Sequence, residues 1–225
     1  VVHEDLYKMD PDIKHPYMEQ FTVSLERELF KDSSFSISYI YRNWKNIIGP
    51  IDRAANYPID RNADYEPYPL TVPDYGDYTI YQRTADTVNT FDYLITNLET
   101  AYKSGYPWIL LNPYRRYQGV EFLFNKRFSN RWQLLASYTL SKAYGTTDNG
   151  QADDIGWGGD VYDPNFWINA DGHSTYDSTH MIKIQGSYII PKIELSLNVY
   201  YHGVTGNAWT ARYRTPLLNQ GRVTF

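Results

Sequence analysis

Residues 117–142 are YQGVEFLFNKRFSNRWQLLASYTLSK, and they alternate between apolar and polar side chains along two segments. In an extended chain Val120, Phe122 and Phe124 point to one face, opposite Glu121 and Asn125. The second segment places Trp132, Leu134, Ala136, Tyr138 and Leu140 on one face. Between the two segments, 129–131 is short and rich in turn-forming residues. The stretch therefore predicts an antiparallel β-hairpin.

The same alternation recurs along the chain and predicts six strands. They span about 20–30, 34–43, 117–128, 132–144, 176–190 and 193–203. All 12 prolines lie outside these segments, as strands require, because proline cannot donate to a sheet ladder. The segments are longer than the roughly 5 or 6 residues usual in soluble proteins. Their length matches the roughly 9–11 residues that a tilted strand needs to cross a bilayer.

The connections between the predicted strands are unequal. Short turns at 31–33, 129–131 and 191–192 lie at one end, and long loops at 44–116 and 145–175 lie at the other. Outer-membrane barrels show this asymmetry, with the long loops outside the cell. Six strands are fewer than the roughly 8 of the smallest transmembrane barrels. We therefore expect an all-β fold in which residues 1–225 form a sector, about six to seven antiparallel strands, of one larger transmembrane β-barrel.

Composition limits the other classes of protein. Mean hydropathy is -0.56, and the chain holds no apolar run as long as a transmembrane helix. Transmembrane β-strands need none, because only every second residue meets lipid. A net charge of -5 argues against nucleic-acid binding. The absence of cysteine excludes disulfides and thiolate metal sites within the chain.

The hairpin at 117–142 resembles the pattern Y-x-G-hydrophobic-E, KRFS-N-W and SYT-x-SK of TonB-dependent receptors. Further matches lie at 163–165, 169–172 and 176–180. The subgroup it is most similar to carries an N-terminal carboxypeptidase-regulatory-like domain. The resemblance implies a C-terminal segment of a 22-stranded barrel in the bacterial outer membrane. It also implies a plug domain outside this chain, through which the TonB complex drives transport.

The loop after the fourth predicted strand is acidic and aromatic. Its aspartates are Asp148, Asp153, Asp154, Asp160 and Asp163. Oxygen-rich loops of this kind can bind Ca²⁺, although the twelve-residue calcium-loop pattern is absent and solvated acidic loops are common. A structural calcium ion is therefore one expectation, and we expect no other cofactor.

Aromatic residues in or beside this loop are candidates for ligand binding. They are Trp157, Tyr162 and Trp167, and exposed rings in loops can stack on a solute. The alternative is that these rings pack the loop onto its neighbours. Asp177 and His180 suggest an acid–base pair, but strand alternation would place them on opposite faces. We therefore identify no catalytic residue.

The leading hypothesis is TonB-dependent active import of a nutrient ligand across the bacterial outer membrane. The expected partners are outer-membrane lipid, the TonB complex and a small nutrient ligand, without nucleic acid and without enzyme activity. Two alternatives remain open. One is an outer-membrane barrel enzyme, which needs a catalytic constellation near the loops, and the other is a soluble carbohydrate-binding β-sandwich.

Overall fold

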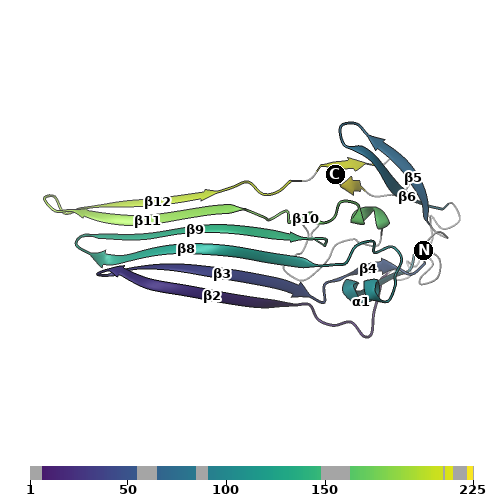
Figure 1. Ribbon diagram of the computed structural model, residues 1–225, viewed down its shortest axis with the longest axis horizontal. Coiled ribbons are helices and arrows are strands. Elements are labelled where there is room, and N and C mark those ends of the chain that lie inside the picture. The colour runs from purple at the N-terminus through teal and green to yellow at the C-terminus, as the bar shows by residue number, and fades with distance from the viewer. Residues whose placement is uncertain are drawn as a thin grey trace, which may run out of the picture.

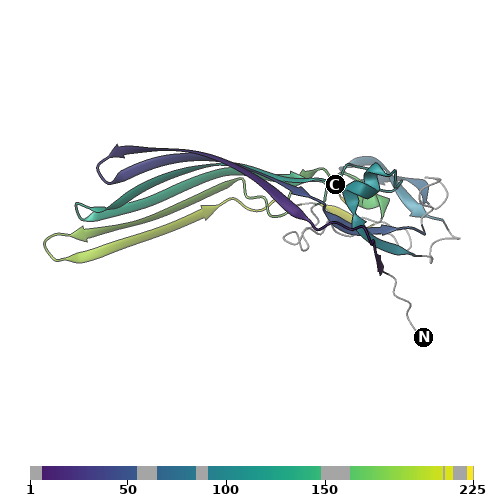
Figure 2. The same cartoon turned by 90° about the horizontal axis from the view of Figure 1, so that it is seen from below.

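The computed structural model describes residues 7–54, 65–84, 91–147, 163–209, 211–214 and 222–224. These residues form an elongated molecule with long strands at one end and a compact folded unit at the other (Figure 1). Figure 2 shows that the long strands form one curved layer. We call the compact unit the cap, and it comprises β1 with the described parts of 46–113 and 163–171.

Six long strands form the main sheet. They are β2 (Tyr17–Phe30), β3 (Ser33–Lys45), β8 (Arg115–Ser129), β9 (Trp132–Gly145), β11 (His180–Ile190) and β12 (Leu195–Val204). Their order is β12-β11-β9-β8-β3-β2, and the short β10 (Gly172–His173) also pairs with β9. Every pairing in this sheet is antiparallel. The prediction of an all-β antiparallel fold with six to seven strands is confirmed.

Along much of the sheet, the register pairs apolar side chains with apolar ones and polar side chains with polar ones. One row on the apolar face runs Leu25, Ile37, Phe122, Tyr138 and Ile182, each opposite the next. The neighbouring row on the other face runs Ser24, Ser38, Glu121 and Thr139. Because side chains alternate along a strand, this alignment gives one continuous apolar face and one largely polar face.

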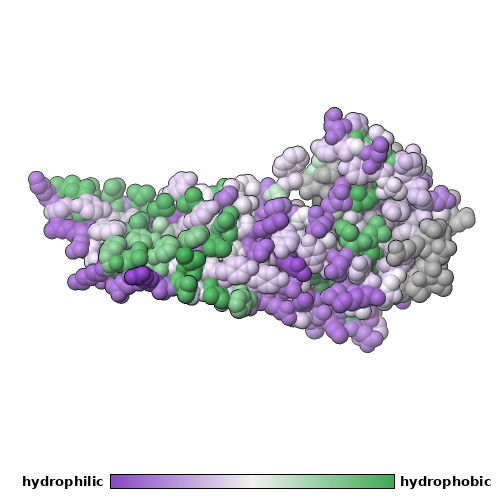
Figure 3. All heavy atoms as spheres, in the orientation of Figure 1, coloured by the Kyte–Doolittle hydropathy of each residue, from purple (hydrophilic) through white to green (hydrophobic). Residues whose placement is uncertain are grey.

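The apolar face carries large side chains that no other part of the described chain covers. Leu25 is 76% exposed and Leu197 is 56% exposed. Figure 3 shows apolar residues gathered over the long strands, between polar residues at the turn end and the more polar cap. On this face the rings of Phe122 and Tyr138 stack at 6.0 Å, and Tyr138 stacks on His180 at 6.1 Å. An exposed apolar surface of this kind requires a partner such as lipid.

The short turns depend on left-handed backbone. Asn130 and Arg131 have φ values of 52° and 69°, the two positive angles that a type I′ hairpin turn needs. Asp32 has φ 63° in the turn between β2 and β3. The Ser33 hydroxyl closes this turn by donating to the Phe30 carbonyl at 2.7 Å. These turns are where the sequence predicted them.

Several predicted strand boundaries are wrong: β2 begins earlier than predicted, at Tyr17 and not at 20, and two other strands begin later. The turn between β11 and β12 extends to Glu194, which has φ 50°, so β12 begins at Leu195 and not at 193. The strand predicted from 176 begins only at His180. Asp177 lies in a preceding turn, because its N–H donates to the Ser174 carbonyl at 2.9 Å and its carboxylate accepts from the Ala143 N–H at 2.7 Å.

Much of the region 44–116, predicted as a long loop, is folded into the cap. A three-stranded sheet has the order β1 (Tyr7–Met9), β7 (Tyr93–Asn97) and β4 (Ile48–Asp52). Beside it lie the hairpin of β5 (Tyr65–Val72) and β6 (Gly76–Arg83), helix α1 (Leu98–Lys103) and the 3₁₀ helix η2 (Pro164–Trp167). A separate pair is formed by β13 (Arg212–Arg214) and β14 (Arg222–Thr224). Within the described ranges no helix is long and apolar enough to span a membrane.

The apolar face leads to a prediction about insertion into lipid. Phe122 lies near the middle of β8, so Phe122→Arg places a charge at mid-bilayer depth and should cost about 2–4 kcal/mol of folding free energy in lipid vesicles. Thr139→Arg, in the neighbouring row on the polar face, should cost much less. Equal losses in the two variants would contradict the assignment of the faces.

Candidate functional site

The polar face of the main sheet is a continuous hydrogen-bonding surface. Near the cap, the Arg42 Nε donates to the Gln20 side-chain oxygen at 2.9 Å, and the guanidinium lies 5.2 Å from the centre of the Tyr117 ring. About halfway along β2 and β3, the hydroxyls of Ser24 and Ser38 are 2.8 Å apart. A surface with charges, hydroxyls and amides suits contact with a polar solute rather than with lipid.

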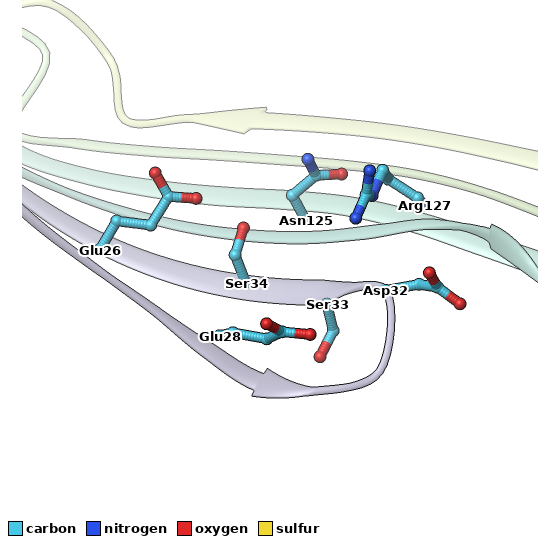
Figure 4. Close-up of a pocket in the computed structure, with 7 residues that line it drawn as sticks. All are labelled: Glu26, Glu28, Asp32, Ser33, Ser34, Asn125 and Arg127. Atoms are coloured by element: carbon cyan, nitrogen blue, oxygen red, sulfur yellow. The ribbon is translucent and has the colours of Figure 1, made fainter.

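At the turn end the polar face contains an open cavity of about 400 Å³. Figure 4 shows the side chains that line it, which are Glu26, Glu28, Asp32, Ser33, Ser34, Asn125 and Arg127. Three carboxylates and a single guanidinium line the cavity, so its lining carries a net negative charge. Groups of this kind attract cations and basic side chains.

The cap has a hydrophobic core of its own. Its buried members are Ile47, Ile51, Tyr65, Leu98, Ala101, Tyr106, Trp108, Ile109 and Trp167. The rings of Tyr65 and Trp108 lie 4.6 Å apart. Because this core joins residues from 47 to 109 with the distant Trp167, it holds the two long connections together. The cap is therefore a packed unit above one end of the sheet.

A buried ion pair lies at the centre of the cap. The Arg83 Nη1 donates to the Asp52 carboxylate at 2.5 Å, and both side chains are almost fully buried. The second carboxylate oxygen accepts from the backbone N–H groups of Ala54 and Asp92, each at 3.0 Å. The Tyr106 hydroxyl donates to the Asp52 carbonyl at 3.0 Å. These contacts compensate for burying the charges, which would otherwise be costly.

Burial and ion pairing shift several pKa values in and beside the cap. Burial raises the pKa of the Tyr65 and Tyr106 hydroxyls, which stay neutral donors in the core. The hydrogen bond from Arg53, followed by that from Lys8, holds the pKa of Asp92 below its usual value. Burial, assisted by the hydrogen bond to Asp171, raises the pKa of Tyr114 to about 12.

Two of the predicted site residues lie inside the cap. Trp167 is only 2% exposed, so its ring packs in the core and offers no face to a solute. The expectation that it stacks on a ligand is therefore corrected, in favour of the packing alternative. Asp163 is also buried, and its carboxylate accepts from the Asn165 N–H at 2.9 Å at the start of η2. It acts there as a helix cap.

The remaining predicted site residues fall outside the described part of the chain. They are Trp157, Tyr162, Asp148, Asp153, Asp154 and Asp160. Among the residues that are described, no group of three His, Asp or Glu side chains could hold a metal ion. Binding of calcium or of a ligand by this loop stays a prediction.

Asn165 is a structural residue that the sequence did not single out. Its side-chain oxygen accepts from the Tyr81 N–H and its amide donates to the Tyr81 carbonyl, each at 2.8 Å. Asn165 therefore pairs with the backbone of β6 as a neighbouring strand would. This contact attaches η2 to β6 and gives the motif at 163–165 a physical role. In the sequence, the only indication of such a role was the match of residues 163–165 to the receptor pattern.

The histidines near Asp177 do not form the pair considered from the sequence. Asp177 contacts His173 instead, with 2.6 Å between the carboxylate and Nδ1. The His180 Nδ1 lies 2.8 Å from the Tyr138 hydroxyl. Asp177 and His180 are separated because Asp177 is held in the turn that precedes β11.

Comparison with known proteins supports the membrane interpretation. The family model described as "Outer membrane beta barrel domain" matches residues 2–209. The TonB-dependent transporter Oar of Myxococcus xanthus is 23% identical over 220 residues. That alignment covers 91% of this chain and 17% of the transporter, so the chain spans a small part of the curated relative. No solved structure is significantly similar.

The buried ion pair leads to a prediction about the stability of the cap. Arg83→Met leaves the Asp52 carboxylate buried without its cation and should cost about 3–5 kcal/mol. Faster thermolysin cleavage of the cap in membrane vesicles measures this loss, while heat-modifiable migration of the barrel should be retained. The Asp52→Asn/Arg83→Met double variant should recover part of the resistance.

A matched control for this prediction is Lys103→Met. It breaks the exposed Lys103–Glu99 pair of α1, which is 2.7 Å long, and should cost no more than about 0.5 kcal/mol. If Arg83→Met were as mild as this control, the ion pair would have no structural importance.

Proposed function

This chain belongs to the outer-membrane β-barrel domain family, and from that premise we propose that it is part of a TonB-dependent transporter that imports a small nutrient. Its location is the bacterial outer membrane, which excludes a soluble carbohydrate-binding β-sandwich. In this membrane the apolar face contacts lipid and the polar face lines the barrel interior.

The observation that carries the proposal is the two-faced sheet with a folded cap at one end. An incoming solute meets the cap first and then the polar face, where Arg42, Ser38 and Glu121 offer both charges and hydroxyls. The acidic cavity beside Glu26 and Glu28 lies at the far end of this path. The arrangement supports selective passage of a polar solute, because hydrogen-bonding groups continue from one end of the wall to the other.

The energy source of transport is proposed from the similarity of this chain to TonB-dependent proteins. Oar is by name a TonB-dependent transporter, and the hairpin at 117–142 resembles that class of receptor. A plug domain outside this chain would contact the TonB complex. The wall described here would hold the plug and the solute, while the TonB complex would drive opening through the plug.

The orientation of the barrel gives a prediction that can be tested without knowing the solute. This chain has no cysteine, so single cysteines can be introduced cleanly. Tyr102→Cys on α1, where the side chain is 38% exposed, should react with a membrane-impermeant maleimide in intact cells. Lys192→Cys in a short turn should react only after lysis, and the unmodified full-length protein gives the background. The reverse pattern would invert the topology.

Import itself is tested by comparing the medium of cells with and without the full-length protein. We expect a specific set of small nutrients to be depleted by the parent strain and left by the deletion strain. The same nutrients should stay in the medium of the parent strain when its proton-motive force is collapsed with a protonophore. Depletion that persists under the protonophore would indicate a passive channel, and identical media in all strains would remove a role in import.

A further inference from the structure

The polar face of the main sheet contains one row of directly opposed residues that crosses all six long strands. From β2 to β12 the row consists of Glu26, Ser36, Leu123, Ser137, Lys183 and His202. Each member is opposite the next in the register, so the row runs across the sheet in the hydrogen-bonding direction. It begins at a carboxylate and ends at an ammonium group and an imidazole ring.

Charges of opposite sign lie at the two ends of this row. At the β2 end, Glu26 and Glu28 both line the open cavity, and Arg127 in the same cavity leaves its net charge negative (Figure 4). At the other end Lys183 is exposed, and the exposed ring of His202 directly opposite offers a further nitrogen. Within the described ranges, none of these side chains forms an ion pair. Both ends therefore keep charges that a solute can meet.

The middle of the row is uncharged. Ser36 and Ser137 offer hydroxyls, and Leu123 between them offers an apolar contact. The neighbouring row toward the turn end has the same character, and it consists of Glu28, Ser34, Asn125, Leu135, Gln185 and Tyr200. Hydroxyls and amides beside single leucines suit a chain of amide groups with small side chains.

The separation of the charges sets the length of the solute. Glu26 on β2 and Lys183 on β11 are separated by four strand spacings, which is about 19 Å along the sheet at about 4.8 Å per spacing. The sheet is curved, so the direct distance is somewhat shorter (Figure 2). An extended peptide advances about 3.3 Å per residue, so about five or six residues span this distance.

We propose that this row binds a zwitterionic oligopeptide of about five or six residues, with its amino terminus at Glu26 and Glu28 and its carboxylate at Lys183 and His202. This inference rests on the proposed function, because it names the class of solute that the polar face admits. Charge complementarity carries it. A solute with charges of one sign would be repelled at one end of the row, whereas a peptide with free termini has a cation and an anion at the required separation.

The test is isothermal titration calorimetry of the full-length protein in detergent with a hexapeptide of alternating alanine and serine. Acetylating its amino terminus should weaken the affinity about fivefold, and amidating its carboxyl terminus should do the same, because each change removes one exposed charged contact. Blocking both termini should multiply the two losses. A tripeptide with free termini, which is too short to reach both ends of the row, should bind no better than a hexapeptide with one blocked terminus.

Substitutions assign each terminus of the peptide to its end of the row. Glu26→Gln/Glu28→Gln should weaken binding of the free hexapeptide about fivefold and leave the affinity for the acetylated peptide unchanged. Lys183→Gln should likewise affect only peptides with a free carboxyl terminus. Glu194→Gln and Lys192→Gln, in the turn after β11, remove the same charges outside the row and should leave every affinity unchanged.

Equal affinities for the free and the doubly blocked hexapeptide would overturn the proposal without any substitution. An equal loss in the two turn variants would also overturn it, and so would an absence of peptide binding, which would assign the row to another occupant such as the plug domain. Calorimetry requires no transport, so a failure here would leave import of another nutrient standing. Peptide binding by a protein whose deletion leaves the medium unchanged would contradict import alone.

Discussion

The hydrogen-bonded register of the six long strands determines on which side of the sheet every side chain lies. Side chains alternate between the two faces of a strand with a period of two. A slip of one residue between β8 and β9 would therefore set Phe122 opposite a polar residue and Glu121 opposite an apolar one. The observed pairing instead sets Phe122 against Tyr138 and Glu121 against Thr139. Both faces of the sheet, the apolar one and the polar one, follow from this single alignment.

The two ends of the sheet are built differently because their connections have different lengths. At one end, turns with left-handed residues such as Asn130 reverse the chain within a few residues. At the other end the connections are long enough to bury apolar side chains of their own. The cap consequently has a core, and the buried pair of Asp52 and Arg83 fixes how its strands meet. A packed cap therefore presents a defined surface at this end of the sheet.

The apolar face and the proposed solute path use the same strands on opposite sides of the sheet. Lys142 and Gln118 point outward with the apolar rows, whereas Arg42 and Tyr117 belong to the polar face. Alternation therefore gives one short stretch of β8 and β9 two chemically different surfaces. Amphipathic rings such as Tyr144 are favourable at the interface between hydrocarbon and water.

The sequence alone determined the all-β class, the six long strands, two of the short turns and the polar or apolar character of each face. Alternation and turn chemistry are properties of neighbouring residues, so they can be read without the fold. Tertiary structure decided the rest. The cap core joins Trp108 to Trp167, and the ion pair joins residues 31 positions apart in the chain. Trp167 could be assigned to packing only when these distant segments were in contact, because burial depends on partners that no local pattern specifies.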